Sequence, residues 1–126
     1  MVKKRGRRRA LQVVVAVPSA AAGRRIGQAL LEMRLAGCVQ TLGPVTSRYR
    51  WKGKIESARE WLLLVKTRAA HQAALRREVR RLHPYEVPEI LSLPAVGSHA
   101  AYLDWLWRET TRPAPRRTTR QTASGR

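Results

Sequence analysis

Two apolar runs in this chain predict strands, and the first of them predicts a strand that is buried on both faces. Leu11–Val17 is almost continuously apolar and β-branched, and a second run, Trp61–Val65, ends a stretch that begins at Lys54. Runs without polar alternation are typical of strands covered on both sides. We therefore expect Leu11–Val17 and Lys54–Lys66 to be the central strands of a sheet.

Apolar residues at helical spacing predict two helices that alternate with the strands. The first is expected over residues 20–36 and to end at Gly37, and the second over residues 69–82 and to end before Pro84. The apolar positions of the first helix are Ile26, Ala29, Leu30 and Met33. Those of the second are Leu75, Val79 and Leu82, opposite a basic face.

Cys38–Trp51 reads as a long strand that contains a proline. Because Pro44 has no backbone N–H, this strand must lie at a sheet edge or bend at a bulge. Lys52-Gly53 supplies a turn into the next strand. Both strands are about twice the usual ~5–6 residues, so their distal halves should project as a hairpin arm whose free edges favour pairing with another subunit.

A short strand and a third helix complete the pattern. The strand is expected over Glu89–Leu93, and Ser98 is expected to cap a helix over Ala100–Trp107. The order is strand, helix, strand, strand, helix, strand and a C-terminal helix. This βαββαβ order predicts an α+β, ferredoxin-like split βαβ fold with a long hairpin arm between its second and third strands.

The net charge of +18 is concentrated at the two ends of the chain. Residues 1–9 carry six basic side chains, and residues 108–126 carry six with a single acid. Such segments cannot bury enough apolar surface to order themselves, so we expect disordered basic tails around one domain of residues 10–107. The tails would contact nucleic acid non-specifically through their charge, or would simply be solvated ends.

Composition excludes several classes of protein. Cys38 is the only cysteine, so neither an internal disulfide nor a cysteine-based zinc site is possible, and a reducing cytoplasm fits. No apolar run approaches the ~20 residues of a membrane span, and Leu11–Val17 suits a strand better than a signal peptide. No Ser/His/Asp or Cys/His arrangement is legible, which argues against an enzyme.

Six motifs follow one another along the chain: Tyr49–Glu56, Glu60, Lys66-Thr67, His83–Glu89, Leu93-Pro94 and Tyr102–Trp105. In this order and spacing they resemble the divalent-cation tolerance proteins of the CutA family, and the likeness runs from about Val13 to Trp107. The resemblance implies a cytoplasmic, ferredoxin-like homotrimer related in architecture to the PII signalling proteins, with arms that pair between neighbours and clefts at subunit boundaries. It also implies a response to divalent metal ions such as copper, and no established reaction.

The resemblance implies a copper site that this chain matches only in part. The family's site is associated with a cysteine just after the first strand and with adjacent histidines before the Pro-Tyr pair. Here Val17-Pro18-Ser19 lacks a thiol, and Leu82 stands in place of the first histidine. His83 remains the one metal candidate, and its alternative role is a helix-terminal histidine that interacts with the helix dipole.

The matched motifs also define a candidate intersubunit cleft. Its carboxylates would offer oxygen ligands to cations or form ion pairs, and its aromatic residues would line the cleft or pack between subunits. The basic excess of the core favours an anion there, so a PII-like sensor of a small anionic metabolite is the alternative to a metal-binding tolerance protein. The candidate cleft residues are Tyr49, Trp51, Lys54, Glu56, Glu60, Lys66, Tyr85, Glu86 and Glu89.

Overall fold

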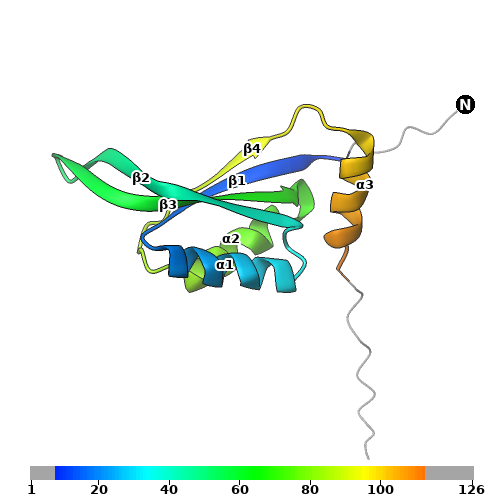
Figure 1. Cartoon of the computed structure of the whole chain (residues 1–126), viewed down its shortest axis with the longest axis horizontal. Coiled ribbons are helices and arrows are strands. Elements are labelled where there is room, and N and C mark those ends of the chain that lie inside the picture. The colour runs from blue at the N-terminus through cyan, green and yellow to red at the C-terminus, as the bar shows by residue number, and fades with distance from the viewer. Residues whose placement is uncertain (1–7, 113–126) are drawn as a thin grey trace, which may run out of the picture.

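The protein folds as a four-stranded antiparallel sheet with three helices, in the order β2-β3-β1-β4 (Figure 1). This computed structural model describes residues 8–112. It confirms the ferredoxin-like α+β fold and the central position of the two most apolar strands. The elements are β1 (Ala10–Val17), α1 (Ala20–Glu32), β2 (Cys38–Trp51), β3 (Lys54–Arg68), a 3-10 turn (Ala69–His71), α2 (Gln72–Leu82), β4 (Ile90–Pro94) and α3 (Ala100–Glu109).

One face of the sheet is covered by α1 and α2 and forms the core. The two helices lie side by side beneath the strands, while α3 stands at the end of the sheet away from the arm (Figure 1). Alternate residues of β1 and β3 point into this layer because side chains of a strand alternate between faces. The fully buried residues of the core include Val13, Val15, Leu63 and Val65 from the strands and Ile26, Leu30, Leu75 and Val79 from the helices.

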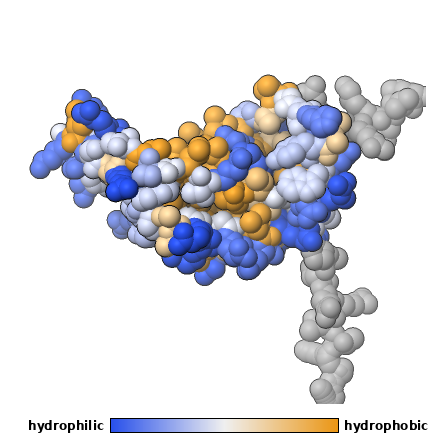
Figure 2. Space-filling model, viewed as in Figure 1, coloured by the Kyte–Doolittle hydropathy of each residue, from blue (hydrophilic) through white to orange (hydrophobic). Residues whose placement is uncertain are grey.

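The opposite face of the sheet, which we call the open face, is apolar but lacks a helical cover. Its central side chains, Val14, Leu62 and Leu64, are only partly buried. Leu42, Leu91 and Leu93 are 50%, 56% and 43% exposed. Figure 2 shows hydrophobic side chains gathered over the sheet, with hydrophilic ones more frequent over the helices and along the arm. Leu11–Val17 was predicted to be buried on both faces. In a single chain, Val13–Val17 is buried on the helix-covered face, whereas Val14 is only partly buried on the open face.

The hairpin arm carries the bulge that its proline predicts. The pairing of β2 with β3 shifts register between Leu42 and Val45, and the intervening Gly43-Pro44 peptide is cis. Gly43 has a φ of +151°, and a Cβ at this position would lie 2.6 Å from the Trp61 ring. Glycine is required here both by the backbone conformation and by the close approach of the ring.

Two predicted helix boundaries and one predicted helix cap differ from the structure. α1 ends at Glu32, because Arg34 turns into the left-handed region (φ 56°) and the amide N–H of Leu35 donates back to the Leu30 carbonyl. A 3-10 turn occupies the first three residues of the expected second helix. Ser98 does not cap α3, whose N-cap residue is His99, without a side-chain hydrogen bond.

α3 extends two residues beyond its expected end because Arg68 holds its C-terminus. The guanidinium of Arg68 donates to the Trp107 carbonyl (2.6 Å) and to the Thr110 hydroxyl (2.9 Å), and it lies over the Trp107 ring. Arg8 forms an ion pair with Asp104 at 2.7 Å. The inner ends of the two predicted tails thus contact the domain, whereas residues 1–7 and 113–126 lie outside the described residues. Within residues 8–112, no helix is long and apolar enough to cross a membrane.

We predict that Gly43→Ala destabilises the protein by about 1–3 kcal/mol, because the new Cβ adds strain to the backbone and clashes with Trp61. The free energy of unfolding in urea measures this effect. Gly97→Ala is the matched control, since nothing lies within 4 Å of its Cβ, and it should change the free energy by less than about 0.5 kcal/mol. Equal effects of the two substitutions would contradict this account of the bulge.

Candidate functional site

A groove of about 670 Å³ lies where the arm leaves the sheet. The end of β1, both strands of the arm and the segment between α2 and β4 contribute to it, so residues far apart in sequence meet there. We call it the arm groove. Its lining residues are Ala16, Ser47, Arg48, Tyr49, Trp51, Glu60, Pro84, Tyr85, Glu86, Val87 and Glu89.

The arm groove contains six of the nine cleft residues predicted from sequence. These are Tyr49, Trp51, Glu60, Tyr85, Glu86 and Glu89. The other three lie elsewhere: Lys54 and Glu56 are exposed near the arm tip, and Lys66 lies toward the other end of β3. The ammonium group of Lys66 donates to the side-chain oxygen of Gln12 at 2.6 Å, on the open face. A single chain therefore does not bring Lys66 to the groove.

Glu60 and Tyr85 form the most buried polar contact of the arm groove. Glu60 is only 7% exposed, and its Oε2 accepts a hydrogen bond from the Tyr85 hydroxyl at 2.8 Å. Burial of the phenol and, secondly, the neighbouring carboxylate raise the pKa of Tyr85 to about 12. This contact ties the segment after α2 to the base of the arm, so it fixes one wall of the groove against another.

His83 is a buried structural histidine in this chain. Its Nδ1 accepts the backbone N–H of Tyr85 (3.0 Å), so its Nε2 carries the proton and donates to the Ala16 carbonyl (2.7 Å). The side chain bonds to β1 and not to the C-terminus of α2, and the residue is 8% exposed. Both nitrogens are thus engaged within the chain, and a metal ion at His83 would have to replace one of these hydrogen bonds.

The charge of the arm groove is the reverse of the overall charge. Three carboxylates, from Glu60, Glu86 and Glu89, face one guanidinium, from Arg48. The expected attraction of an anion to this cleft is therefore not supported by its lining, which suits a cation better. Within residues 8–112, no group of three His, Cys, Asp or Glu side chains is placed closely enough to hold a metal ion.

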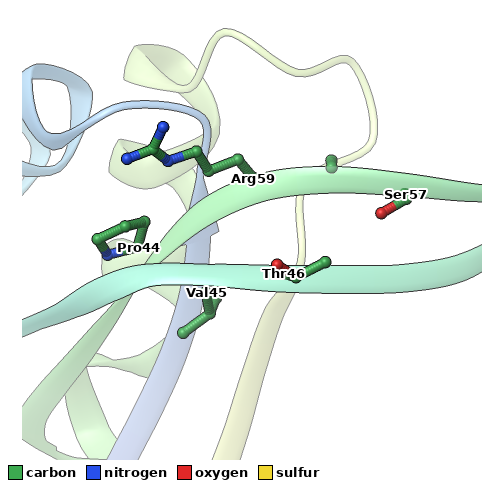
Figure 3. Close-up of a pocket in the computed structure, with 6 residues that line it drawn as sticks. Pro44, Val45, Thr46, Ser57 and Arg59 are labelled. Atoms are coloured by element: carbon green, nitrogen blue, oxygen red, sulfur yellow. The ribbon is translucent and has the colours of Figure 1, made fainter.

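A smaller pocket of about 280 Å³ lies on the arm itself, beside the bulge (Figure 3). β2 contributes Pro44, Val45 and Thr46, and β3 contributes Ser57 and Arg59. Arg59 is its one charged residue, and this guanidinium lies 5.7 Å from the centre of the Trp61 ring. The pocket thus lacks the carboxylates that distinguish the arm groove.

Sequence reasoning missed several lining residues of the arm groove. Ala16, Ser47 and Val87 contribute its wall, and small or apolar residues of this kind carry no chemical signal in a sequence. Arg48 was not among the nine cleft residues predicted from sequence, although it lines the groove. The pairing of Thr46–Tyr49 with Glu56–Arg59 could have placed Ser47 and Arg48 near Glu60, since the turn fixes the register of the hairpin.

The chain combines a ferredoxin-like sheet, a bulged hairpin arm and a groove where the arm meets a Pro-Tyr-Glu segment. It therefore belongs to the class of α+β, ferredoxin-like proteins with a long hairpin arm. Comparisons with known proteins agree. The CutA1 divalent ion tolerance protein family model matches residues 11–109. The divalent-cation tolerance protein CutA of Thermus thermophilus is 48% identical over 99 residues, which is 79% of this chain and 95% of that protein. The chain belongs to the CutA family of divalent-cation tolerance proteins.

Other relatives and solved structures support this assignment. CutA of Pectobacterium atrosepticum is 40% identical over 97 residues, covering 77% of this chain and 88% of that protein. The solved structure of the Thermus thermophilus protein matches with a TM-score of 0.79 at 44% identity, over 81% of this chain and 99% of that chain. The CutA1 structure from Oryza sativa also gives 0.79, at 37% identity, over 82% of this chain and 94% of that chain.

We predict that Tyr85 ionises only at strongly alkaline pH, with a pKa of about 12. Ultraviolet difference titration should lose this component in Tyr85→Phe, whereas Tyr102→Phe, the control, should keep it. Glu60→Gln should lower the pKa of Tyr85 only part of the way, because burial is the larger cause.

The same contact sets a pH dependence of stability. Because folding raises the pKa of Tyr85, its contribution is present below pH 10 and is lost as the pH rises to about 12. In Tyr85→Phe, unfolding titrations should lose this part of the pH dependence. An unchanged alkaline profile in this variant would contradict the assignment.

Proposed function

We propose that this protein is a homotrimer that binds divalent metal ions, copper among them, at arm grooves between subunits, and so contributes to metal tolerance by binding and not by catalysis. The observation that carries the proposal is the placement of Glu60, Glu86 and Glu89 around one groove in a chain that is otherwise strongly basic. Membership of a divalent-cation tolerance family supports the same choice of ligand. The proposal places the protein in the cytoplasm, in keeping with its one free cysteine.

The chemistry of the groove influences which metal ions it prefers. Copper is the metal that the resemblance implies, yet the thiol and the second histidine are missing, and His83 is engaged in internal hydrogen bonds. Carboxylate oxygens suit harder ions such as Mn²⁺ better than soft ones. Because His83 is engaged, we expect any copper ion in the groove to bind through the carboxylates of Glu86 and Glu89, with further ligands from a neighbouring subunit.

Two surfaces of the chain support assembly. Leu42, Leu91 and Leu93 lie exposed together with the partly buried centre of the open face, and apolar patches of this kind mark interaction surfaces. β2 also lies at the sheet edge over 14 residues, with unpaired backbone groups on one side. Packing the open faces and pairing the arms of neighbouring copies would cover both surfaces, and would bring further side chains to each arm groove.

We predict that Glu86→Gln/Glu89→Gln weakens the binding of Mn²⁺ and Cu²⁺ by at least about 10-fold, because two of the anionic ligands are lost. Isothermal titration calorimetry of the full chain measures the dissociation constants. The matched control is Glu32→Gln/Glu109→Gln, which removes the same charge outside the arm groove. Unchanged binding in the first variant, or an equal loss in the control, would contradict the assignment of the groove.

A further inference from the structure

The outward side of α2 carries the densest basic cluster among the described residues. Leu75 and Val79 face the core, so the helical period turns the two positions that follow each of them toward solvent. Four arginines occupy these positions in two adjacent columns, one turn apart in each column. We call them the arginine face; they are Arg76, Arg77, Arg80 and Arg81, all exposed.

Neighbouring elements extend the arginine face. The guanidinium of Arg25, on α1, donates to the carbonyl of Leu82 at 3.3 Å, which brings a fifth positive charge to the end of α2. A second groove, of about 400 Å³, opens between the helix and the segment that follows it. We call it the basic groove, and its lining residues are Arg77, Arg80, Arg81, Tyr85, Glu86 and Pro88.

Acidic residues compensate for only a small part of this charge. Glu78 is the one acid of α2, and Arg81 occupies it with two hydrogen bonds, Nη2 to Oε2 at 2.6 Å and Nε to Oε1 at 3.2 Å. Elsewhere in residues 8–112, the ion pairs use Arg8 and Arg34. The guanidinium groups of Arg76, Arg77 and Arg80 thus form no ion pair in the part of the chain that the structure describes.

This arrangement opposes the stability of the isolated helix. Like charges four residues apart, as in the two columns of α2, repel each other and disfavour the helix. Arg80 and Arg81 lie in the last turn and gain from the helix dipole, whereas Arg76 and Arg77 lie too far from it. A row of bound anions would turn this repulsion into attraction.

We propose that the arginine face binds the phosphodiester backbone of a single-stranded nucleic acid, without sequence preference. Guanidinium groups match phosphate oxygens with two parallel hydrogen bonds. Arginines four residues apart stand about 6 Å apart along the helix, so one flexible strand meets several of them in succession. A membrane surface fits less well, because no residue of α2 is among the large exposed hydrophobic side chains that would enter a bilayer.

The test separates this face from the basic ends of the chain. Arg76→Gln/Arg77→Gln/Arg80→Gln removes three charges, keeps the Arg81–Glu78 pair, and uses a residue that suits helices. Arg116→Gln/Arg117→Gln/Arg120→Gln removes the same charge from the C-terminal segment. Fluorescence anisotropy of a labelled single-stranded oligonucleotide, titrated with each full-length variant between about 50 and 200 mM salt, gives the affinity and its salt dependence.

The face variant should bind about 100-fold more weakly than wild type at about 0.1 M salt, and the slope of log K against log salt should fall by about 2. The C-terminal variant should lose clearly less affinity, and circular dichroism should show that both variants are folded. An equal or larger loss in the C-terminal variant overturns the proposal, because net charge or the tail would then explain the binding. Unchanged affinity in the face variant also overturns it.

A further probe distinguishes the source of the phosphate groups. Vesicles with anionic phospholipid, or inorganic phosphate alone, present the same chemistry without the nucleic acid chain. Tighter binding of wild type to the vesicles than to the oligonucleotide, or saturation of the arginine face by inorganic phosphate at equal phosphate concentration, overturns the proposal. Glu86 lines both grooves, so removing the neighbouring positive charges should not weaken the binding of Mn²⁺ at the arm groove, and loss of oligonucleotide binding with Mn²⁺ binding retained separates the two sites.

Discussion

The pairing of β1 with β3 at the centre of the sheet is the interaction on which the rest of the structure depends. Leu11–Val17 of β1 and Trp61–Val65 of β3 are largely apolar on both faces, yet within residues 8–112 one layer of helices covers them. α1 and α2 cover one face, and the open face keeps Leu42, Leu91 and Leu93 exposed. A second copy of the chain is the simplest cover, because the hydrophobic effect opposes leaving this much contiguous apolar surface in water. The proposed assembly and the proposed metal site both follow from this constraint.

The arm groove is positioned by hydrogen bonds that link three distant segments. His83 attaches the start of the Pro-Tyr-Glu segment to the end of β1, through the Ala16 carbonyl. Tyr85 then attaches the same segment to Glu60, just past the bulge of the arm. The residue that suggested a metal ligand thus holds the groove in place, and the proposed ligands are the carboxylates instead. This division of roles explains how the groove persists in a chain that lacks the thiol and the second histidine.

Much of the fold could be predicted from the sequence, because its strongest signals are local. The bounds Cys38–Trp51 were predicted as observed, and Pro44 correctly placed that strand at an edge with a bulge. The predicted end of α1 was wrong, because only the packing of Leu35 reveals that the chain leaves the helix at Arg34. The charge of the arm groove also could not be predicted. Net charge was counted over the whole core, whereas folding places the arginines of α2 largely outside the groove.

The central claim is that the metal site is completed only when copies of this chain assemble over the open face. The molar mass in solution tests this claim most directly, measured by light scattering on the full chain as it elutes from a sizing column. We predict three times the chain mass of 14.3 kDa, maintained on dilution. A monomer of 14.3 kDa would contradict the account, because the open face and the arm edges would then have no partner and the arm groove no second subunit.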